Sequence, residues 1–140
     1  MPNATPSLTL ALLQAREATM RFFRPQLNRQ GLTEQQWRVI RLLRQHGELE
    51  SRQLAHLACI LQPSLCGVLA RLERDGLVRR RKSAEDQRRS LVSLATAGEV
   101  CFQAMRGQME DNYREIERRL GEEKVVRLLA LLHELKGLRP

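Results

Sequence analysis

Basic side chains are concentrated in one short stretch of this 140-residue chain. Residues 77–89 read LVRRRKSAEDQRR and hold six lysines and arginines against two acids, a net charge of +4 out of +8 for the whole chain. A hairpin tip needs residues that favour a turn, but it does not need this much positive charge. The excess of positive charge predicts a contact with an anionic partner, and the class of partner must be inferred from the rest of the sequence.

Length and composition narrow the choice of partner. The chain has the length of one domain, 1–140, and can bury a core without a disulfide or a metal. A pI near 10.6 favours nucleic acid or an anionic membrane surface. No apolar run approaches the roughly 18 residues of a transmembrane helix, and the first twelve residues lack the pattern of a signal peptide. We therefore expect a cytoplasmic protein with reduced thiols at Cys59, Cys66 and Cys101.

Apolar periodicity predicts helices on both sides of the basic stretch. The expected helices cover about 8–28 with a bend at Pro25, 33–46 after a Thr33–Gln36 capping box, a short segment capped by Ser51, 63–75 closed by Gly76, 96–120, and 125–138. Two strands are expected at 77–81 and 90–94.

The order of these elements predicts the fold class. Helix, helix, turn, helix and basic hairpin is the winged helix-turn-helix arrangement, an all-α fold with a small β-hairpin wing (α+β). We assign 33–95 to the DNA-binding lobe. Segments 7–30 and 96–138 have broad apolar faces that one small chain leaves exposed, so we expect them to form a homodimer.

The helix 63–75 is expected to lie in the major groove of double-stranded DNA. Its face opposite the apolar stripe carries small residues first, which allows close approach to base edges, and arginines later, where phosphates would lie. A solvated helix face is the structural alternative, and the basic hairpin favours DNA. The residues expected to contact DNA are Arg52, Gln53, Pro63, Ser64, Cys66, Gly67, Arg71, Arg74, Arg79, Lys82, Asp86, Arg88 and Arg89.

Three quoted segments carry a family resemblance. QPSLCGVLARLERDG at 62–76, LVRRRK at 77–82 and DQRRSLVSLATAG at 86–98 together resemble the signature of MarR-type transcription regulators. Four segments further resemble the subgroup of homoprotocatechuate-pathway repressors, which control the catabolism of hydroxyphenylacetic acids: LTLALLQARE, FFRPQLN, GLTEQQWRVIR and PSLCGVLARLERDGLV. Two residues depart from the subgroup: Cys66 replaces a usual Thr on the base-facing side, and Ala95 replaces a usual Thr before the long helix. We expect Thr96 to take over that cap.

The resemblance implies roles for single residues. Asp86 and Arg88 match the family's wing pair, in which the carboxylate orients a guanidinium suited to a narrow minor groove. The alternative is an ordinary turn ion pair of under about 1 kcal/mol. Arg89 is expected to make a second phosphate contact, whereas Arg52 and Gln53 are either phosphate ligands or simply solvated.

A dimer sets two recognition helices about one turn of duplex apart, roughly 34 Å, so we expect an imperfect palindrome as operator. The resemblance implies a small aromatic carboxylate as effector, such as 4-hydroxyphenylacetate or 3,4-dihydroxyphenylacetate. Such a ligand needs apolar walls and one cation. Arg16 is the candidate cation, with Met20 and Trp37 as candidate walls. Alternatively, Arg16 pairs with a glutamate such as Glu17, and Trp37 is part of the core.

Other protein classes fit the sequence less well. Its three histidines are scattered and it has neither a phosphate-binding glycine loop nor a nucleophile elbow, so we expect no enzyme and no cofactor. A metal sensor built on His56, Cys59 and Cys66 is disfavoured because Cys66 faces the groove. An oxidant sensor is a minor alternative because Cys59, beside Ile60, is expected to be buried. A non-specific architectural DNA-binding protein is the strongest rival, and it would lack a preference for a palindrome.

Overall fold

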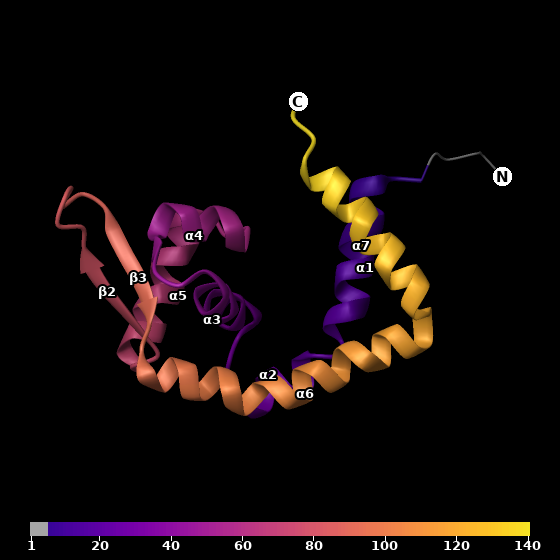
Figure 1. Cartoon of the computed structure of the whole chain (residues 1–140), viewed down its shortest axis with the longest axis horizontal. Coiled ribbons are helices and arrows are strands. Elements are labelled where there is room, and N and C mark those ends of the chain that lie inside the picture. The colour runs from indigo at the N-terminus through magenta and orange to yellow at the C-terminus, as the bar shows by residue number, and fades with distance from the viewer. Residues whose placement is uncertain (1–5) are drawn as a thin grey trace. The chain divides into compact units, whose positions relative to one another are not determined.

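A computed structural model describes residues 6–140 and shows a mostly helical chain with one small sheet (Figure 1). The elements in chain order are α1 (Leu8–Met20), α2 (Arg24–Arg29), α3 (Glu34–His46), β1 (Leu49–Glu50), α4 (Ser51–Ala58), α5 (Gln62–Arg74), β2 (Val78–Lys82), β3 (Ser90–Leu94), α6 (Thr96–Leu120) and α7 (Glu122–Lys136). This is the predicted class of fold, all-α with a β-hairpin wing. The described residues form two compact units, 24–107 and 6–23 with 108–140.

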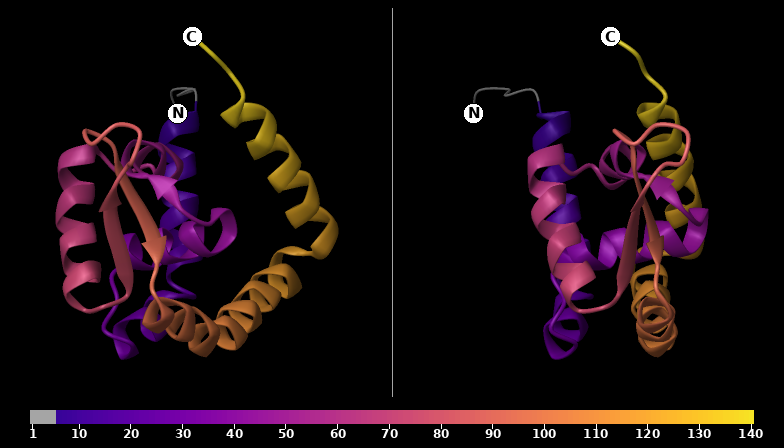
Figure 2. Two further views of the ribbon diagram at one scale, coloured as in Figure 1. Left: turned by 60° about the vertical axis from the view of Figure 1, so that its left-hand side comes forward. Right: turned by 90° about the vertical axis from the view of Figure 1, so that its left-hand side faces the viewer.

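The unit 24–107 holds most of the buried side chains. Its helices bury one apolar stripe each, and Ile40 of α3, Leu54 of α4 and Leu72 of α5 are completely buried. These side chains belong to helices of 13, 8 and 13 residues, too short to be stable alone in water. Packing against each other and against the sheet therefore stabilises them, as α5 does where it runs beside β2 (Figure 2).

The sheet is antiparallel in the order β1-β3-β2. Val78 pairs with Leu94 and Lys82 with Ser90, so β2 and β3 form the predicted hairpin. Strand β1, in which Leu49 pairs with Val92, was not predicted. Its two residues are too few to show an alternating pattern, and only the pairing with β3 makes them a strand.

Two glycines join the hairpin to the helices on either side. Gly76 has φ +74, as predicted for the end of α5, and Leu77 N–H donates to the Leu72 carbonyl at 2.9 Å. A Cβ at Gly98, in the first turn of α6, would overlap the Leu77 carbonyl oxygen and the Leu94 side chain. Only glycine therefore allows α6 to start so close to the hairpin.

The N-terminal helix was predicted too long. The chain leaves α1 at Met20, and Phe22 and Phe23 donate to carbonyls three residues back, at 3.1 and 3.0 Å. The break therefore precedes Pro25, which is the second residue of α2. Pro25 costs nothing there, because the first turn of a helix leaves its N–H groups unbonded.

Two predicted helix caps were wrong by one residue. Glu50, not Ser51, is the N-cap of α4, and Gln53 accepts the Glu50 N–H at 3.2 Å. The pairing of Glu50 in β1 holds it in the extended conformation that an N-cap requires. Thr96 is the first residue of α6, and the Ala95 carbonyl accepts the Glu99 N–H at 3.0 Å. Ala95 thus occupies the cap position predicted for Thr96.

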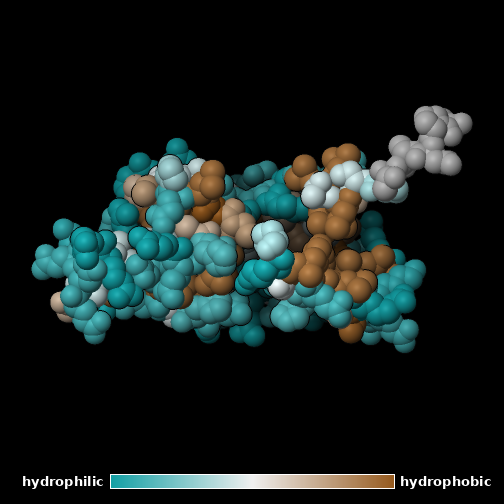
Figure 3. Space-filling view, turned by 90° about the horizontal axis from the view of Figure 1, so that it is seen from above, coloured by the Kyte–Doolittle hydropathy of each residue, from teal (hydrophilic) through white to brown (hydrophobic). Residues whose placement is uncertain are grey.

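The other unit consists of α1, the second half of α6 and α7. Helix α7 begins three residues earlier than predicted, because Glu122 and Glu123 stabilise its positive N-terminal end. Neither α1 nor α7 has a buried residue, and hydrophobic side chains are gathered on the surface over both helices (Figure 3). Phe23 packs against Tyr113 with ring centroids 4.8 Å apart.

No single helix within residues 6–140 has both the length and the apolar character to cross a membrane. Helices α4 and α5 reach that composition only as a pair, and they are bent by 106° at the turn between them. Both helices bury their apolar stripes inside the unit 24–107.

Candidate DNA-binding surface

Helix α5 separates its residues into two faces as the sequence predicted. Leu65, Val68, Leu69 and Leu72 are buried. The residues predicted to face DNA on this helix are all exposed: Pro63, Ser64, Cys66, Gly67, Arg71 and Arg74. A Cβ at Gly67 would have no atom within 4 Å, so the fold does not require glycine at that position. The surface beside Gly67 is open to a partner.

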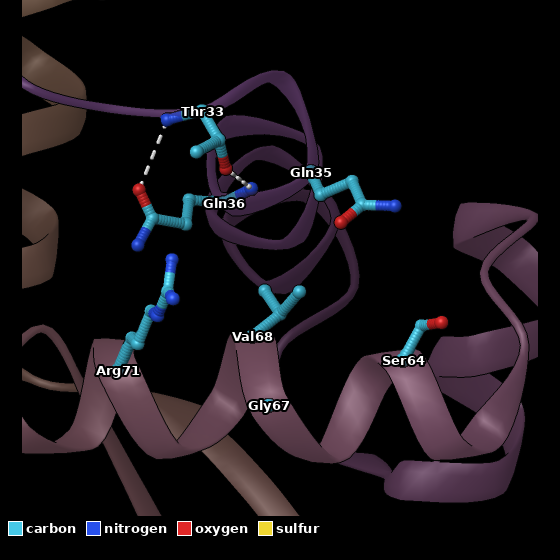
Figure 4. Close-up of a pocket in the computed structure, with 7 residues that line it drawn as sticks. All are labelled: Thr33, Gln35, Gln36, Ser64, Gly67, Val68 and Arg71. Atoms are coloured by element: carbon cyan, nitrogen blue, oxygen red, sulfur yellow. Dashed lines mark hydrogen bonds between the residues drawn. The ribbon is translucent and has the colours of Figure 1, made fainter.

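This face of α5 continues into a hollow of about 240 Å³ beside the start of α3 (Figure 4). The Thr33 hydroxyl accepts the Gln36 N–H at 3.1 Å, and the Gln36 side chain accepts the Thr33 N–H at 3.0 Å. The predicted capping box is therefore present. Arg71 projects from α5 toward these two residues (Figure 4). Within residues 6–140 its guanidinium has no ion-pair partner, so it adds a positive charge beside the positive end of α3.

Gln35 also lines this hollow and was not among the predicted contact residues. It lies 29 positions before Ser64 on the opposite wall, and only the packing of α3 against α5 brings the two together. No local pattern in the sequence could have indicated it.

The turn between α4 and α5 differs from the prediction at Cys59. We expected a buried thiol, but Cys59 is exposed and ends α4 in the left-handed conformation, with φ 54. This conformation turns the following Ile60 inward, where it is 5% exposed. The hydrophobic neighbours of Cys59 in sequence are therefore no guide to its burial, and the argument against an oxidant sensor based on burial does not hold.

On α4, both predicted phosphate ligands are exposed. The Gln53 side-chain oxygen caps its own helix by accepting the Glu50 N–H, so only its amide N–H₂ could donate to a phosphate. Arg52 has no ion-pair partner within the described part of the chain. Both positions are compatible with a phosphate contact, and the contact itself remains a prediction.

Three arginines of the hairpin are held by glutamates elsewhere in the lobe. Arg80 lies 3.1 Å from Glu73 of α5, and Arg81 lies 2.8 Å from Glu48, which precedes β1. The hydrogen bond to Glu48 raises the pKa of Arg81 above its ordinary value. These pairs connect β2 to α5 and to the segment before β1, so part of the positive charge of the wing is neutralised within the lobe.

Arg89 is the third of these arginines. Its guanidinium lies 3.0 Å from the Glu50 carboxylate, and this hydrogen bond raises the pKa of Arg89. The predicted phosphate contact of Arg89 would have to compete with Glu50. In contrast, Arg79 and Lys82 are exposed and have no ion pair within residues 6–140, so they present their charges outward.

The tip of the wing contains the ion pair expected from the sequence. Arg88 donates from Nε to Asp86 Oδ1 at 3.2 Å, and its backbone N–H donates to the same oxygen at 3.0 Å. Hydrogen bonds from the side chain and backbone of Arg88 hold the pKa of the Asp86 carboxyl below its ordinary value. Ser83 is buried, and its hydroxyl accepts the N–H groups of Glu85 and Asp86 at 3.2 and 3.4 Å.

This geometry presents a positioned cation to a partner. The Arg88 side chain is 91% exposed although its guanidinium is hydrogen-bonded to Asp86. The pair therefore has little effect on folding, because exposed ion pairs contribute little to stability. It limits the orientations of a guanidinium that projects from the lobe.

The candidate effector residues lie in two different units. Arg16 and Met20 are on α1, and Arg16 lies 3.7 Å from Glu17, the pairing foreseen as the structural alternative. Trp37 is 8% exposed and stacks on Phe102 with ring centroids 5.7 Å apart, so it is a core residue of its own unit. A ligand role for the three residues remains a prediction.

The described residues contain no group of three His, Cys, Asp or Glu side chains that could hold a metal ion. The candidate site consists of one exposed helix face, a hollow beside it and a positively charged hairpin. Together with the winged helix-turn-helix fold, these features define a DNA-binding protein.

Comparisons with known proteins agree with this class. The model of the MarR family matches residues 32–90. The homoprotocatechuate degradative operon repressor of Escherichia coli is 48% identical over 132 residues, which cover 94% of this chain and 89% of the relative. This chain belongs to the MarR family of transcriptional regulators.

Two solved structures are similar along nearly the whole chain. The crystal structure of transcriptional regulator PA4135 is 65% identical, has a TM-score of 0.95, and the match covers 97% of this chain and 100% of that one. The crystal structure of NadR in complex with 4-hydroxyphenylacetate is 45% identical with a TM-score of 0.88, covering 99% and 100%.

Proposed function

We propose that this protein represses an operon for the breakdown of an aromatic acid, and that a small aromatic carboxylate releases it from its operator. The observation that carries the proposal is the exposed face of α5 next to the basic wing, in a chain 48% identical to a repressor of homoprotocatechuate degradation. A repressor of this kind acts on DNA in the cytoplasm.

In the proposed complex, α5 enters the major groove and the wing reaches the neighbouring backbone or minor groove. Pro63, Ser64, Cys66 and Gly67 face base edges, because they occupy the exposed side of the first turns of α5. The cations beyond them contact phosphates: Arg71, Arg74, Arg79 and Lys82 beside the helix and wing, and Arg52 on α4. Arg88 at the wing tip reaches into the minor groove. These contacts make affinity fall steeply with salt.

The proposed active form is a homodimer joined through the unit that contains α1 and α7. Large hydrophobic side chains on these helices are strongly exposed, among them Leu13 at 56%, Leu129 at 60% and Leu131 at 62%. A second copy of the chain would cover these surfaces, since monomers rarely leave such patches open. Two copies place two recognition helices about one turn of duplex apart, roughly 34 Å, on an imperfect palindrome.

The proposed effector is 4-hydroxyphenylacetate or its 3,4-dihydroxy analogue. NadR has been crystallised with 4-hydroxyphenylacetate and is 45% identical to this chain, which supports the choice of class. Arg16 is the proposed counter-ion of the carboxylate, with Met20 of the same helix as a proposed apolar wall. The role expected for Trp37, which stacks on Phe102 in the core of the other unit, stays a prediction from sequence. Since Arg16 lies beside Glu17, the ligand must replace or share that partner.

The decisive experiment combines DNA binding with effector release. Binding to the DNA upstream of the protein's own gene is measured by fluorescence anisotropy against a shuffled duplex, and hydroxylated aromatic acids are then added. We expect a large preference for the upstream DNA and its loss with the effector. Equal binding to both duplexes, unaffected by the acids, would identify an architectural DNA-binding protein instead.

Calorimetry tests the role of Arg16. A charged hydrogen bond is worth about 1.5 to 3 kcal/mol, so Arg16→Ala should weaken binding of 4-hydroxyphenylacetate by about tenfold to a hundredfold. Without effector, the variant should bind DNA as the wild type does. Equal effector affinities of the two proteins would remove Arg16 from the site.

A further inference from the structure

The residue directly before α5 is unusual for its position. Leu61 is the N-cap of this helix, a position where serine, threonine, aspartate or asparagine normally satisfies a free backbone N–H. Its side chain makes no capping hydrogen bond. It also does not join the core, for it is 79% exposed, more than any other large hydrophobic residue in the described part of the chain. Neither local structure nor packing explains a leucine there.

The surroundings of Leu61 fit a nucleic acid better than an apolar protein surface. Gln62, Pro63 and Ser64 follow it on the exposed side of α5. The same lobe carries the wing, whose exposed cations Arg79 and Lys82 have no ion pair within residues 6–140. An exposed apolar side chain on a polar, positively charged lobe is best covered by a partner that is anionic as a whole and also carries an isolated apolar group. In the major groove, the C5-methyl of thymine is such a group.

We propose that Leu61 is a specificity-determining residue that packs against the methyl group of one thymine in each half of the operator. The inference rests on the proposed function and deepens it, since it assigns a base preference to the start of the recognition helix. The N-terminal residues of a recognition helix are those that contact base edges. Leucine can neither donate nor accept a hydrogen bond, so the edge of a G·C pair would lose its bonds to water without replacement.

The size of the effect follows from the group that is buried. One methyl removed from water contributes about a fourfold change in affinity, and two equivalent half-sites contribute about fifteenfold. A change in affinity of this size can be assigned to the methyl group, because deoxyuridine differs from thymidine by the methyl alone. A substitution in the DNA therefore isolates the proposed contact.

The experiment begins with a preferred duplex, obtained by enrichment of a random DNA library on the full-length wild-type protein. Each symmetric pair of thymines in that duplex is then replaced by deoxyuridine, and dissociation constants are measured at about 150 mM salt. The variants are Leu61→Ala, which removes the side chain, and Leu61→Met, which keeps an apolar group of similar reach. Melting temperatures of all three proteins are compared to establish that they fold alike.

We expect one thymine pair whose replacement weakens wild-type binding by about fifteenfold. Leu61→Met should retain this sensitivity, and Leu61→Ala should bind the thymine and deoxyuridine duplexes equally. An enriched sequence at which no thymine pair shows the effect, or at which Leu61→Ala keeps it, would overturn the inference and leave the proposed function intact. Failure to enrich any sequence would overturn both.

Discussion

Gly67 offers a direct test of how closely α5 approaches DNA. It lies on the exposed face of the helix, and a Cβ added there would have no atom of the protein within 4 Å. Alanine is more favourable than glycine inside a helix by about 1 kcal/mol. In a protein of this length, a gain of that size raises the melting temperature by about 4 °C. We therefore expect Gly67→Ala to stabilise the fold.

The same methyl group should weaken operator binding. It would project from α5 between Ser64 and Arg71, where the helix is proposed to meet base edges (Figure 4). A base contact is worth about 1 to 3 kcal/mol, so displacing the helix from one base in each of two half-sites should lower affinity by at least about thirtyfold. Binding to non-specific DNA should change less, because it depends on phosphate contacts.

Gly107→Ala is the matched control. Gly107 is also inside a helix and also has open space at its Cβ, but it lies on α6. It should gain similar stability and keep wild-type operator affinity. Calorimetric melting and fluorescence anisotropy with the operator measure the two effects. A Gly67→Ala protein that melts higher and binds the operator as tightly as the wild type would refute the close approach of α5.

Three further predictions concern the wing tip, the recognition helix and the response to acid. Arg88→Ala should weaken operator binding strongly and reduce the slope of log affinity against log salt, since one guanidinium contact with DNA and its released counterion are lost; wild-type affinity at physiological salt would contradict the role of the wing. Cys66→Thr should leave the melting temperature nearly unchanged and alter the ranking of operator variants, whereas a large drop in melting temperature with an unaltered ranking would place Cys66 in the core. Hydrogen bonds from Arg118 and Arg119 lower the pKa of Glu115 to about 2, so its stabilising effect is present above the ordinary pKa of 4.5 and is lost as the pH falls toward 2. The free energy of unfolding of Glu115→Gln should therefore depend less on pH between about 4.5 and 2 than that of the wild type. An identical pH dependence of the two proteins would show that the hydrogen bonds from Arg118 and Arg119 to Glu115 do not affect stability.

Local patterns in the sequence predicted the features that depend on neighbouring residues. The spacing of Leu65, Val68 and Leu72 is that of a helix with one buried side, and all three are buried. Strand β3 has the predicted bounds, and β2 is shifted by one residue. The Asp86–Arg88 pair, which the family resemblance implied, is also present, and it joins residues only two positions apart in one turn.

Features set by distant residues required the tertiary structure. Arg81 reaches Glu48 and Arg89 reaches Glu50, residues 33 and 39 positions away, so the sequence overstated the positive charge that the wing offers to DNA. Likewise, only pairing with β3 turns Leu49 and Glu50 into a strand, which moves the cap of α4 from Ser51 to Glu50.

The turn between α4 and α5 is a further case in which tertiary packing, and not the local sequence, decides which side chains are buried. The sequence places Cys59, Ile60 and Leu61 in one apolar run, but the structure buries only Ile60. The left-handed backbone at Cys59 decides which of the three side chains enters the core, and it is a property of the packed turn. Sequence alone thus predicted the class of protein, and it marked the helix that we propose to face DNA, because both inferences rest on local motifs, periodicity and charge. Tertiary packing decided which individual side chains stay exposed and unpaired, and so available to DNA. A contact between distant residues leaves no pattern in either segment of the sequence.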